Sequence, residues 1–366
     1  MLRVFEPFLE NEDKAAVEMA LDAGWISSGG PYVLDFESSL AKLFNRKYAI
    51  SMNSGTSALE AAVHALNLEP GSEVILPAFT IISCVNAVLA NDLVPVFVDI
   101  EDVSWNIDAK QLASALSPKT KAIMIVHMYG QSCEVDVIQR FATDNGLALI
   151  EDASQVHGGA LDGIPLGSFG DVSIFSFYAN KIITTGEGGA LLTNNENIAA
   201  TAADYRNLYF DSERRFRHSA LGRNYRLTSL QAALGRSQLA RIDSIIASKI
   251  ALGHMYLDIF SDLPFRKRLP KSNDKSCVYW MNAFEFEDGA CDVEKLTKVL
   301  KNNGFETRYF FSNLAKQKFV QNRCIVVNDL SESDLAEKNG IYFPSSHKVK
   351  QEDIYRMKDL ITECLN

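Results

Sequence analysis

Lys181 stands where a lysine could do covalent chemistry. It follows the apolar, strand-like run "DVSIFSFYAN" and precedes the small residues "TTGEGG". An amine held in apolar surroundings loses its proton readily and can attack a carbonyl carbon, which is the reaction of a Schiff-base lysine. Most lysines are instead solvated surface charges. The position of Lys181 alone therefore leaves both interpretations open.

Two further polar sites follow strand-like runs. Asp152 ends "LALIED", where it could either cap the next helix through "DASQ" or face a bound cationic ring. Gly55 opens the helical segment "SGTSALEAAVHAL", in which free amides and the hydroxyls of Ser54, Thr56 and Ser57 would suit a phosphate. Such residues more often serve only as a helix cap.

Taken together, the three sites indicate pyridoxal phosphate (PLP). This cofactor requires a phosphate anchor, a carboxylate that keeps the ring nitrogen protonated and a lysine that binds the aldehyde. The Walker pattern and the dinucleotide pattern G-x-G-x-x-G are both missing from the sequence, so ATP and NAD lose their usual support.

The elements that must position these residues alternate between strands and helices from about residue 46 to 193. Apolar, β-rich runs such as "SEVILPA", "VPVFVDI" and "KAIMIVHMY" are separated by amphipathic segments. This pattern predicts an α/β fold with a mostly parallel, seven-stranded sheet covered on both faces. Ligands of such sheets bind beyond the carboxyl ends of the strands.

After about residue 230 the pattern changes. We expect one long helix over "SLQAALGRSQLARIDSIIASKIALGHMYLDIF", followed by short strands and two more helices. The sequence thus predicts a large PLP-binding domain over residues 1–240 and a small C-terminal α+β domain over 241–366.

Composition excludes several classes of protein. The formal charge of −10 argues against nucleic-acid binding. No apolar run approaches the ~20 residues of a membrane span, and the N-terminal residues lack the pattern of a signal peptide, so we expect a cytoplasmic protein. The six cysteines form no C-x-x-C pair, so we expect free thiols and no metal site.

The chain resembles the DegT/DnrJ/EryC1/StrS sugar aminotransferases, which have PLP-dependent transferase fold type I. The resemblance extends over nearly the whole chain. It rests on blocks that include "GWISSGGPYVLDFE", "NSGTSALEAAVHAL", "LPAFTIISCVNAV", "IEDASQVHGG", "GSFGDVSIFSFYANKIITTGEGG" and "LGRNYRLTSLQAALGRSQL".

The resemblance implies roles around the cofactor ring. Lys181 would carry the cofactor, Asp152 would bind the pyridine nitrogen and Gln155 would lie near the ring hydroxyl. The family usually covers the ring with an aromatic side chain just after the "P-x-x-T" turn. Here that position is Ile81, with Phe79 nearby.

The resemblance also implies a phosphate site shared between two subunits. Gly55, Thr56 and Ser176 would contact the phosphate, and Asn224 of "GRNYR" would reach the phosphate of the partner in a homodimer. The basic run "RRFRHSALGRNYR" would then be a loop at a shared active site. A solvated basic loop is the alternative.

The implied reaction moves the amino group of L-glutamate to a nucleotide-linked keto sugar for surface-polysaccharide synthesis, with pyridoxamine phosphate as the intermediate form of the cofactor. A GDP- or dTDP-linked 4-keto-6-deoxyhexose is expected, with GDP-4-keto-6-deoxymannose as the first choice. Members that make GDP-perosamine tend to read "TRPFFYPLH", whereas this chain reads "TRYFFSNLAKQ". The substituted positions are Ser312, Asn313 and Ala315, and Cys277 replaces a second histidine of the pattern.

Two alternatives remain at this point. One is a PLP-dependent sugar dehydratase of the same fold. Those relatives replace the lysine with histidine or add an iron–sulfur centre, whereas this chain keeps Lys181 and has no clustered cysteines. The other is a non-catalytic relative that binds PLP or a nucleotide sugar. A binding protein has no use for the base Lys181.

Overall fold

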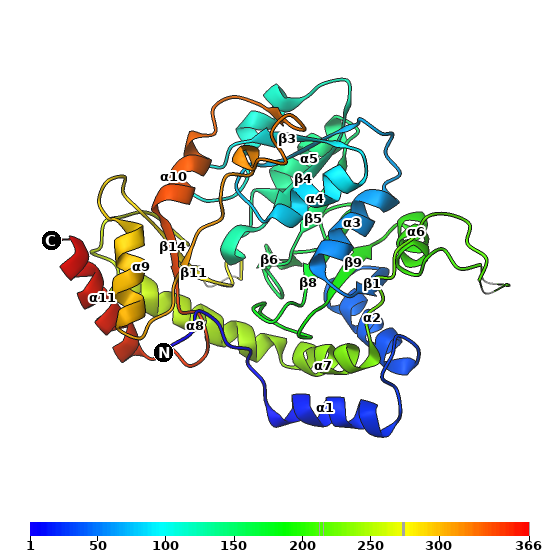
Figure 1. The fold of residues 1–366 in the computed structure, drawn as a ribbon, viewed down its shortest axis with the longest axis horizontal. Coiled ribbons are helices and arrows are strands. Elements are labelled where there is room, and N and C mark those ends of the chain that lie inside the picture. Colours follow the sequence, from blue (N-terminus) through cyan, green and yellow to red (C-terminus); the bar gives the residue numbers. More distant parts are fainter. Residues whose placement is uncertain (212, 215, 273–274, 366) are drawn as a thin grey trace.

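The main sheet lies at the centre of the molecule (Figure 1). The structure is a computed structural model that describes residues 1–211, 213–214, 216–272 and 275–365. The sheet has eight strands in the order β1-β9-β8-β5-β4-β2-β3-β13. The strands are β1 (Tyr48–Met52), β2 (Glu73–Pro77), β3 (Val94–Val98), β4 (Thr120–Val126), β5 (Ala148–Asp152), β8 (Val172–Ser176), β9 (Gly189–Thr193) and β13 (Ile325–Val326).

All seven predicted strands are present, and the sheet is mostly parallel as predicted. Only β9 runs against its neighbours, β1 and β8. The eighth strand, β13, was not predicted because it has only two residues and lies far along the chain. Its Ile325 pairs with Val96 of β3. The central strand β2 is buried at every position, as expected for a sheet covered on both faces.

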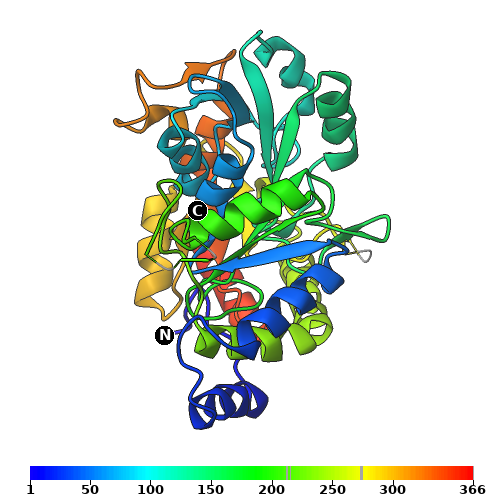
Figure 2. The same ribbon diagram turned by 90° about the vertical axis from the view of Figure 1, so that its right-hand side faces the viewer.

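Helices surround this sheet in both views (Figures 1 and 2). They are α1 (Asn11–Asp22), α2 (Pro31–Leu43), α3 (Gly55–Ala65), α4 (Ile82–Ala90), η1 (Ala109–Ala115), η2 (Met128–Gly130), α5 (Val135–Asp144), α6 (Glu196–Arg206) and α7 (Ser229–Ala240). Helix α1 lies outside the others and packs along α7. The amphipathic segment "DAKQLASALS", which follows β3, forms the 3₁₀ helix η1 and not an α-helix.

The prediction of one long helix after residue 230 is wrong in one respect, because the helical region is divided into α7 and α8 (Ile242–Ile259). Arg241 separates the two, with φ −112° and ψ 10°. Its guanidinium donates to Asp13 Oδ2 at 2.5 Å, and Asp13 also accepts from Gln238 of α7 at 2.8 Å. These contacts with α1 hold the break, and nothing in the local sequence signals them.

A second sheet is formed by the C-terminal part of the chain. Its order is β10-β11-β14-β12, with strands β10 (Phe265–Arg268), β11 (Asn282–Phe286), β12 (Arg308–Tyr309) and β14 (Gly340–Phe343). Its helices are α9 (Val293–Asn302), η3 (Leu314–Lys316), α10 (Ser331–Asn339) and α11 (Gln351–Leu365), of which α10 was not predicted. A third sheet pairs β6 (Ala160–Leu161) with β7 (Ile164–Pro165). The division at residue 240 stays a prediction.

The N-terminal residues lie beside this second sheet and not beside the first. The amide of Leu2 donates to Gly304 O, and the amide of Ser345 donates to Val4 O, both at 2.7 Å. The chain therefore begins and ends on the same side of the molecule (Figure 1).

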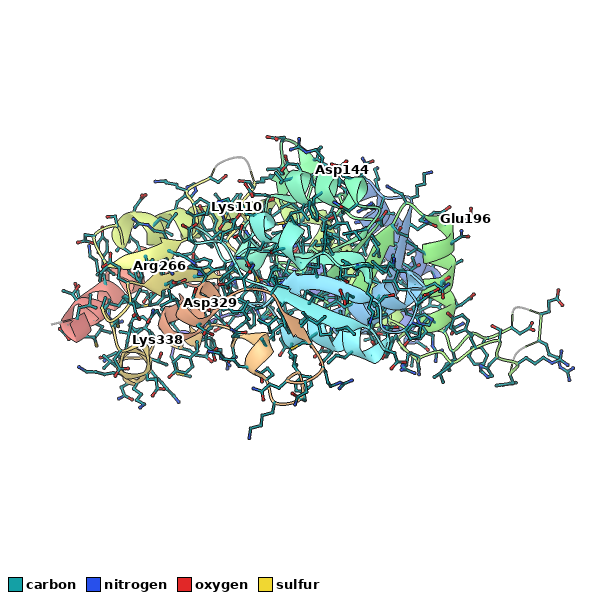
Figure 3. The ribbon with its side chains drawn as sticks, turned by 90° about the horizontal axis from the view of Figure 1, so that it is seen from above. Lys110, Asp144, Glu196, Arg266, Asp329 and Lys338 are labelled. Carbon is teal, nitrogen blue, oxygen red and sulfur yellow. The ribbon has the colours of Figure 1, made fainter. Side chains whose placement is uncertain are left out.

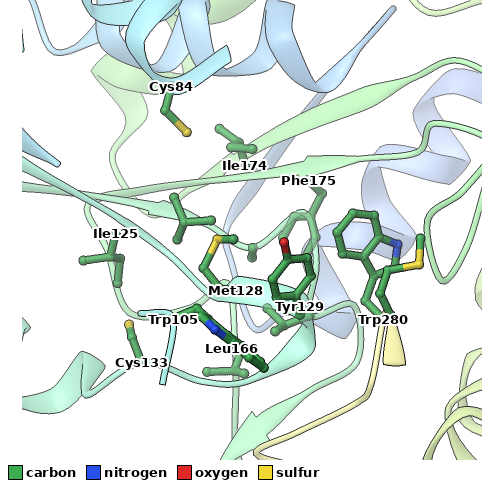
Figure 4. Packing of buried hydrophobic residues seen from close by; sticks show 14 of the residues in the cluster. Cys84, Trp105, Ile125, Met128, Tyr129, Cys133, Leu166, Ile174, Phe175 and Trp280 are labelled. Carbon is green, nitrogen blue, oxygen red and sulfur yellow. The ribbon is translucent and has the colours of Figure 1, made fainter. Parts of the chain in front are cut away.

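An aromatic cluster joins the two sheets around Tyr129. The centre of its ring lies 5.5 Å from that of Trp105 and 6.4 Å from that of Trp280 (Figure 4). The ring of Phe310 lies 4.7 Å away. Charged side chains lie at the exterior, where Lys110, Asp144, Glu196 and Lys338 are exposed (Figure 3). Within the described parts of the chain, no helix combines the length and apolar character needed to cross a bilayer.

Candidate active site

A cavity of about 290 Å³ opens at the carboxyl ends of β1, β5 and β8. It contains all of the predicted site residues except Asn224. Its lining consists of Ser54, Gly55, Thr56, Leu59, Ile81, Ser83, Asp152, Ser154, Gln155, Ser176, Tyr178, Asn180, Lys181, Glu187, Trp280, Phe311 and Tyr342.

The start of helix α3 forms one end of this cavity. Ser54 caps the helix, since its Oγ accepts from the amide of Ser57 at 3.0 Å. The hydroxyls of Thr56 and Ser83 lie 2.8 Å apart. Gly55 is required because a Cβ there would lie 2.6 Å from the Cβ of Ser176. The first amides of a helix have no acceptor within the helix, so this end of the cavity fits an anion such as a phosphate.

Asp152 ends strand β5 and is 1% exposed. Its Oδ1 accepts from the amide of Ser154 at 2.9 Å, so the expected cap is present, although it caps a turn and not a helix. The thiol of Cys84 lies 3.6 Å from Oδ2 and donates to it. Burial raises the pKa of Cys84 well above its usual range, so the thiol keeps its proton. The carboxylate can therefore cap the turn and still face the cavity.

Glu151, the preceding residue, faces the other side of the sheet. Its Oε1 accepts from the amide of Gly167 at 2.6 Å and lies 3.1 Å from Nε2 of His127. The amide of Cys133 donates to Nδ1 of that ring, so Nε2 carries the proton and donates to Glu151. Glu151 therefore belongs to the interior of the fold.

Lys181 reaches the cavity from the segment after β8. Burial lowers the pKa of its amine to about 8, although the nearby carboxylate of Asp152 raises it. Its Nζ lies 3.8 Å from the centre of the Trp280 ring. The amine can lose its proton near neutral pH, as a nucleophile or a general base must.

Gln155 is oriented by the backbone behind it. Its Oε1 accepts from the amide of Tyr129 at 2.6 Å. Tyr129 has a positive φ of 53°, so this bond also fixes an unusual turn. With Oε1 engaged, the side chain can offer Nε2 as a donor to an oxygen of a ligand.

Three aromatic residues of the cavity lining were not predicted from the sequence. Tyr342 lies in β14 of the second sheet, while Trp280 and Phe311 lie in the segments that precede β11 and follow β12 of that sheet. Only the docking of that sheet brings them to the cavity, and nothing in their local sequence marks them. Ile81 lies in the lining at the start of α4.

Asn224 lies outside the cavity and is exposed. It belongs to a segment that runs beside the end of β1, where the amide of Asn53 donates to Tyr225 O at 2.8 Å. Beyond these contacts, the described part of the segment between α6 and α7 extends away from the body of the molecule (Figure 1). Glu60 of α3 fixes the base of this segment by accepting from Tyr225 Oη at 2.9 Å and from Arg223 Nε at 3.1 Å.

The four departures from the family pattern also lie outside the cavity lining. Asn313 is buried and donates to Asp334 Oδ1 at 2.8 Å, while its own Oδ1 accepts from the amide of Ala315 at 3.0 Å. Ser312 is exposed. Cys277 is buried and pairs through its backbone with Gln131.

Among the described residues, no three His, Cys, Asp or Glu side chains gather as a metal site would require. The six cysteines, all of which lie in the described residues, form no disulfide bond.

Comparison with known proteins gives consistent matches. The model of the DegT/DnrJ/EryC1/StrS aminotransferase family matches residues 7–362. The chain is 36% identical to GDP-perosamine synthase of Vibrio cholerae over 85% of each chain. It is 34% identical to GDP-perosamine synthase of Caulobacter vibrioides over all of this chain and 98% of that one.

Solved structures agree with the fold. PseC of Helicobacter pylori, an aminotransferase of pseudoaminic acid biosynthesis, is 25% identical, with a TM-score of 0.92 over 100% of this chain and 99% of that one. DesI, solved in the presence of its TDP-sugar product, is 28% identical, with a TM-score of 0.89 over 100% and 93%. With a lysine, a carboxylate and a helix start meeting in one cavity, and with a family match over almost its whole length, this chain is a member of the DegT/DnrJ/EryC1/StrS aminotransferase family.

Proposed function

We propose that this enzyme uses PLP to transfer the amino group of L-glutamate to a nucleotide-linked keto sugar. The observation that carries the proposal is the meeting of Lys181, Asp152 and the start of α3 in one cavity. The donor set fits PLP, because it combines an amine, a buried carboxylate and a helix start whose closeness to Ser176 leaves no room for a Cβ at Gly55.

When bound, PLP supplies an aldehyde carbon that takes up the amino group and a ring that withdraws electrons from it. The hydroxyls of Thr56 and Ser176 and the amides at the start of α3 would hold the phosphate. Asp152 would keep the ring nitrogen protonated, and Gln155 would donate Nε2 to the ring oxygen. Ile81 would offer an aliphatic side chain to the ring.

Lys181 acts as the proton carrier. With a pKa of about 8, its amine can take the proton from Cα of glutamate near neutral pH and can deliver a proton to the sugar carbon that receives the nitrogen. The apolar wall of Trp280 and Phe311 excludes water from this transfer.

The acceptor that we propose is a 4-keto-6-deoxyhexose linked to GDP or dTDP, and GDP-4-keto-6-deoxymannose is the first choice. Support comes from the likeness to two GDP-perosamine synthases over most of their length. The likeness to DesI, solved with a TDP-sugar, keeps the dTDP-linked sugar as the second choice. A cavity of about 290 Å³ is small for cofactor and substrate together, so we place the nucleotide at its mouth. The reaction would serve the synthesis of surface polysaccharide in the cytoplasm.

We further propose a homodimer with shared active sites. The phosphate end of the cavity has hydroxyls and amides, and none of the described Arg side chains lines it. Asn224 lies outside the cavity, in a segment beside the end of β1, so we propose that it contacts the phosphate of a partner.

The absorbance spectrum of the cofactor tests the proposed function. PLP is added to the purified protein, and L-glutamate follows. We expect a visible band from the lysine-bound cofactor, which glutamate converts to the shorter-wavelength band of pyridoxamine phosphate. Reduction with borohydride before glutamate should attach the cofactor to Lys181 in a peptide map. Lys249 is the internal control, since burial lowers the pKa of this second lysine to about 7 and it lies outside the cavity. Attachment at Lys249, or a band that glutamate leaves unchanged, would overturn the assignment.

A further inference from the structure

We propose that Trp280 is a positioning residue, whose ring face holds the amine of Lys181 beside the reacting carbon whenever that amine is not bonded to the cofactor. The inference rests on the proposed function, because it concerns the same lysine. It adds a residue from the second sheet to the proton-transfer machinery, and it assigns that residue to the lysine and not to the sugar.

The contact itself is direct. Nζ of Lys181 lies 3.8 Å from the centre of the Trp280 ring, well within the range over which an ammonium is attracted to an aromatic face. The indole Nε1 donates to Asn180 O at 2.7 Å. Since Asn180 immediately precedes Lys181, the same tryptophan fixes both the backbone that carries the lysine and the end of its side chain.

Trp280 is itself held firmly. It is 4% exposed, and its ring stacks on that of Tyr129 at 6.4 Å with an angle of 15° (Figure 4). The amide of Val278 donates to Gly130 O at 2.8 Å. A Cβ on Gly130 would lie 2.6 Å from the Trp280 amide nitrogen, so the two loops touch at a position that only glycine allows. The ring is therefore a rigid surface and not a mobile cover.

Few charged groups near Lys181 are available to stabilise its ammonium form, which leaves this role to the face of the Trp280 ring. Asp152, Cys84 and His157 interact electrostatically with Lys181, and Glu187, Tyr178 and Tyr342 also line its cavity. Cys84 keeps its proton, and burial lowers the pKa of His157 to about 3, so that ring is neutral. Asp152 is the one charge among the first three, and in the loaded enzyme it faces the ring nitrogen. The Trp280 face then stabilises the ammonium form that Lys181 adopts after taking a proton.

The first test measures the amine directly, in the full-length holoenzyme loaded with pyridoxamine phosphate, where Lys181 is free. Trace acetic anhydride labels unprotonated amines, and mass spectrometry of the Lys181 peptide against pH gives its pKa. We expect Trp280→Leu to lower that pKa by about half a unit to one unit, because the ammonium loses the ring face. Trp280→Phe keeps an aromatic ring that attracts a cation less strongly, so the pKa of Lys181 in this variant should lie between those of the wild type and Trp280→Leu. Trp25→Leu, on a half-exposed tryptophan outside the cavity, controls for loss of an indole.

The second test separates the lysine from the sugar. Stopped-flow spectra follow the half-reaction with glutamate, in which no sugar is present. If Trp280 positions the amine, Trp280→Leu slows this half-reaction about 10- to 100-fold, and Trp25→Leu does not. If the rate with glutamate is unchanged and only the step with a keto sugar slows, Trp280 is a sugar platform and the proposal is wrong. An unchanged Lys181 pKa in both Trp280 variants also overturns it. If Trp280→Leu does not fold, Trp280→Phe decides both tests.

A different result would show that the proposed function itself is wrong. In that case borohydride would not attach PLP to Lys181 of the wild-type protein.

Discussion

Glu151 and Asp152 are consecutive residues of β5 whose carboxylates lie on opposite faces of the sheet. Glu151 accepts from the His127 ring and from the amide of Gly167, inside the fold. Asp152 accepts from Ser154 and Cys84 and lines the cavity. The pleat of one strand thus separates a carboxylate that bonds inside the fold from one that lines the cavity. We expect a substitution at Glu151 to lower stability and a substitution at Asp152 to lower activity.

Asp152→Asn removes the charge but keeps the shape of the side chain. We expect kcat to fall about 100- to 1000-fold, because the ring nitrogen of PLP loses the carboxylate that holds its proton. The visible band should persist, since Lys181 is intact. Cys84→Ser keeps a donor toward Oδ2 and should stay close to wild type. Full activity in Asp152→Asn would contradict the role of this carboxylate.

Glu151→Gln should instead destabilise the fold. Burial opposes ionisation, but the His127 ring and the amides of Gly167 and Gly170 hold the pKa of Glu151 below its usual range. A carboxyl whose folded pKa is lowered gives stability that is present above its unfolded pKa and lost as pH falls below it. Urea titrations should show a loss of about 2–4 kcal/mol at pH 7, and a loss that shrinks as pH falls below ~4.

The control for this loss is Glu196→Gln, on the exposed side of α6 (Figure 3). We expect little change there at any pH. If Glu151→Gln unfolds at the same urea concentration as wild type, the buried network does not contribute to stability.

Gly55→Ala tests the phosphate end of the cavity. The new Cβ would lie 2.6 Å from the Cβ of Ser176, so α3 must shift away from β8. We expect the dissociation constant of PLP, measured by quenching of protein fluorescence, to rise about tenfold or more. Gly29→Ala is the matched control, because a Cβ at Gly29 meets no atom within 4 Å. Equal affinities in the two variants would argue against α3 as the phosphate anchor.

Mixed dimers test the shared active site. Lys181→Ala alone should abolish turnover while the circular dichroism spectrum stays that of the wild type. Asn224→Asp should weaken PLP binding, because its carboxylate would face the phosphate of the partner. When the two variants are unfolded and refolded together, half of the dimers are mixed and each holds one intact site. Activity should return to about a quarter of wild type.

No recovery on mixing would mean that Asn224 acts within its own subunit or not at the site. A monomer in solution would remove the shared site altogether.

The site residues at the ends of strands could be predicted from the sequence. Gly55, Asp152 and Lys181 stand directly after strand-like runs, and parallel strands end at one edge of a sheet, so the sequence alone brings them together. The pairing of a lysine with a carboxylate and a helix start then indicates the cofactor. Ser176 and Gln155 came from the resemblance, and both line the cavity.

Trp280, Phe311 and Tyr342 could not be found in this way. They lie in the second sheet or in segments next to its strands, and their place in the cavity depends on contacts such as that between Val278 and Gly130. Similarly, the break at Arg241 depends on Asp13, more than two hundred residues away. Local periodicity carries no information about such pairs.

Strand β13 lies well past the proposed boundary at residue 240, yet it extends the first sheet by pairing with β3, and the amide of Leu2 bonds to Gly304 beside the second sheet. Each half of the polypeptide therefore completes a structure that is formed mainly by the other half. Fragments 1–240 and 241–366, expressed separately, would each expose apolar edges that are covered in the whole chain. They should aggregate alone and complement one another when coexpressed, and the intact chain should unfold in a single cooperative transition.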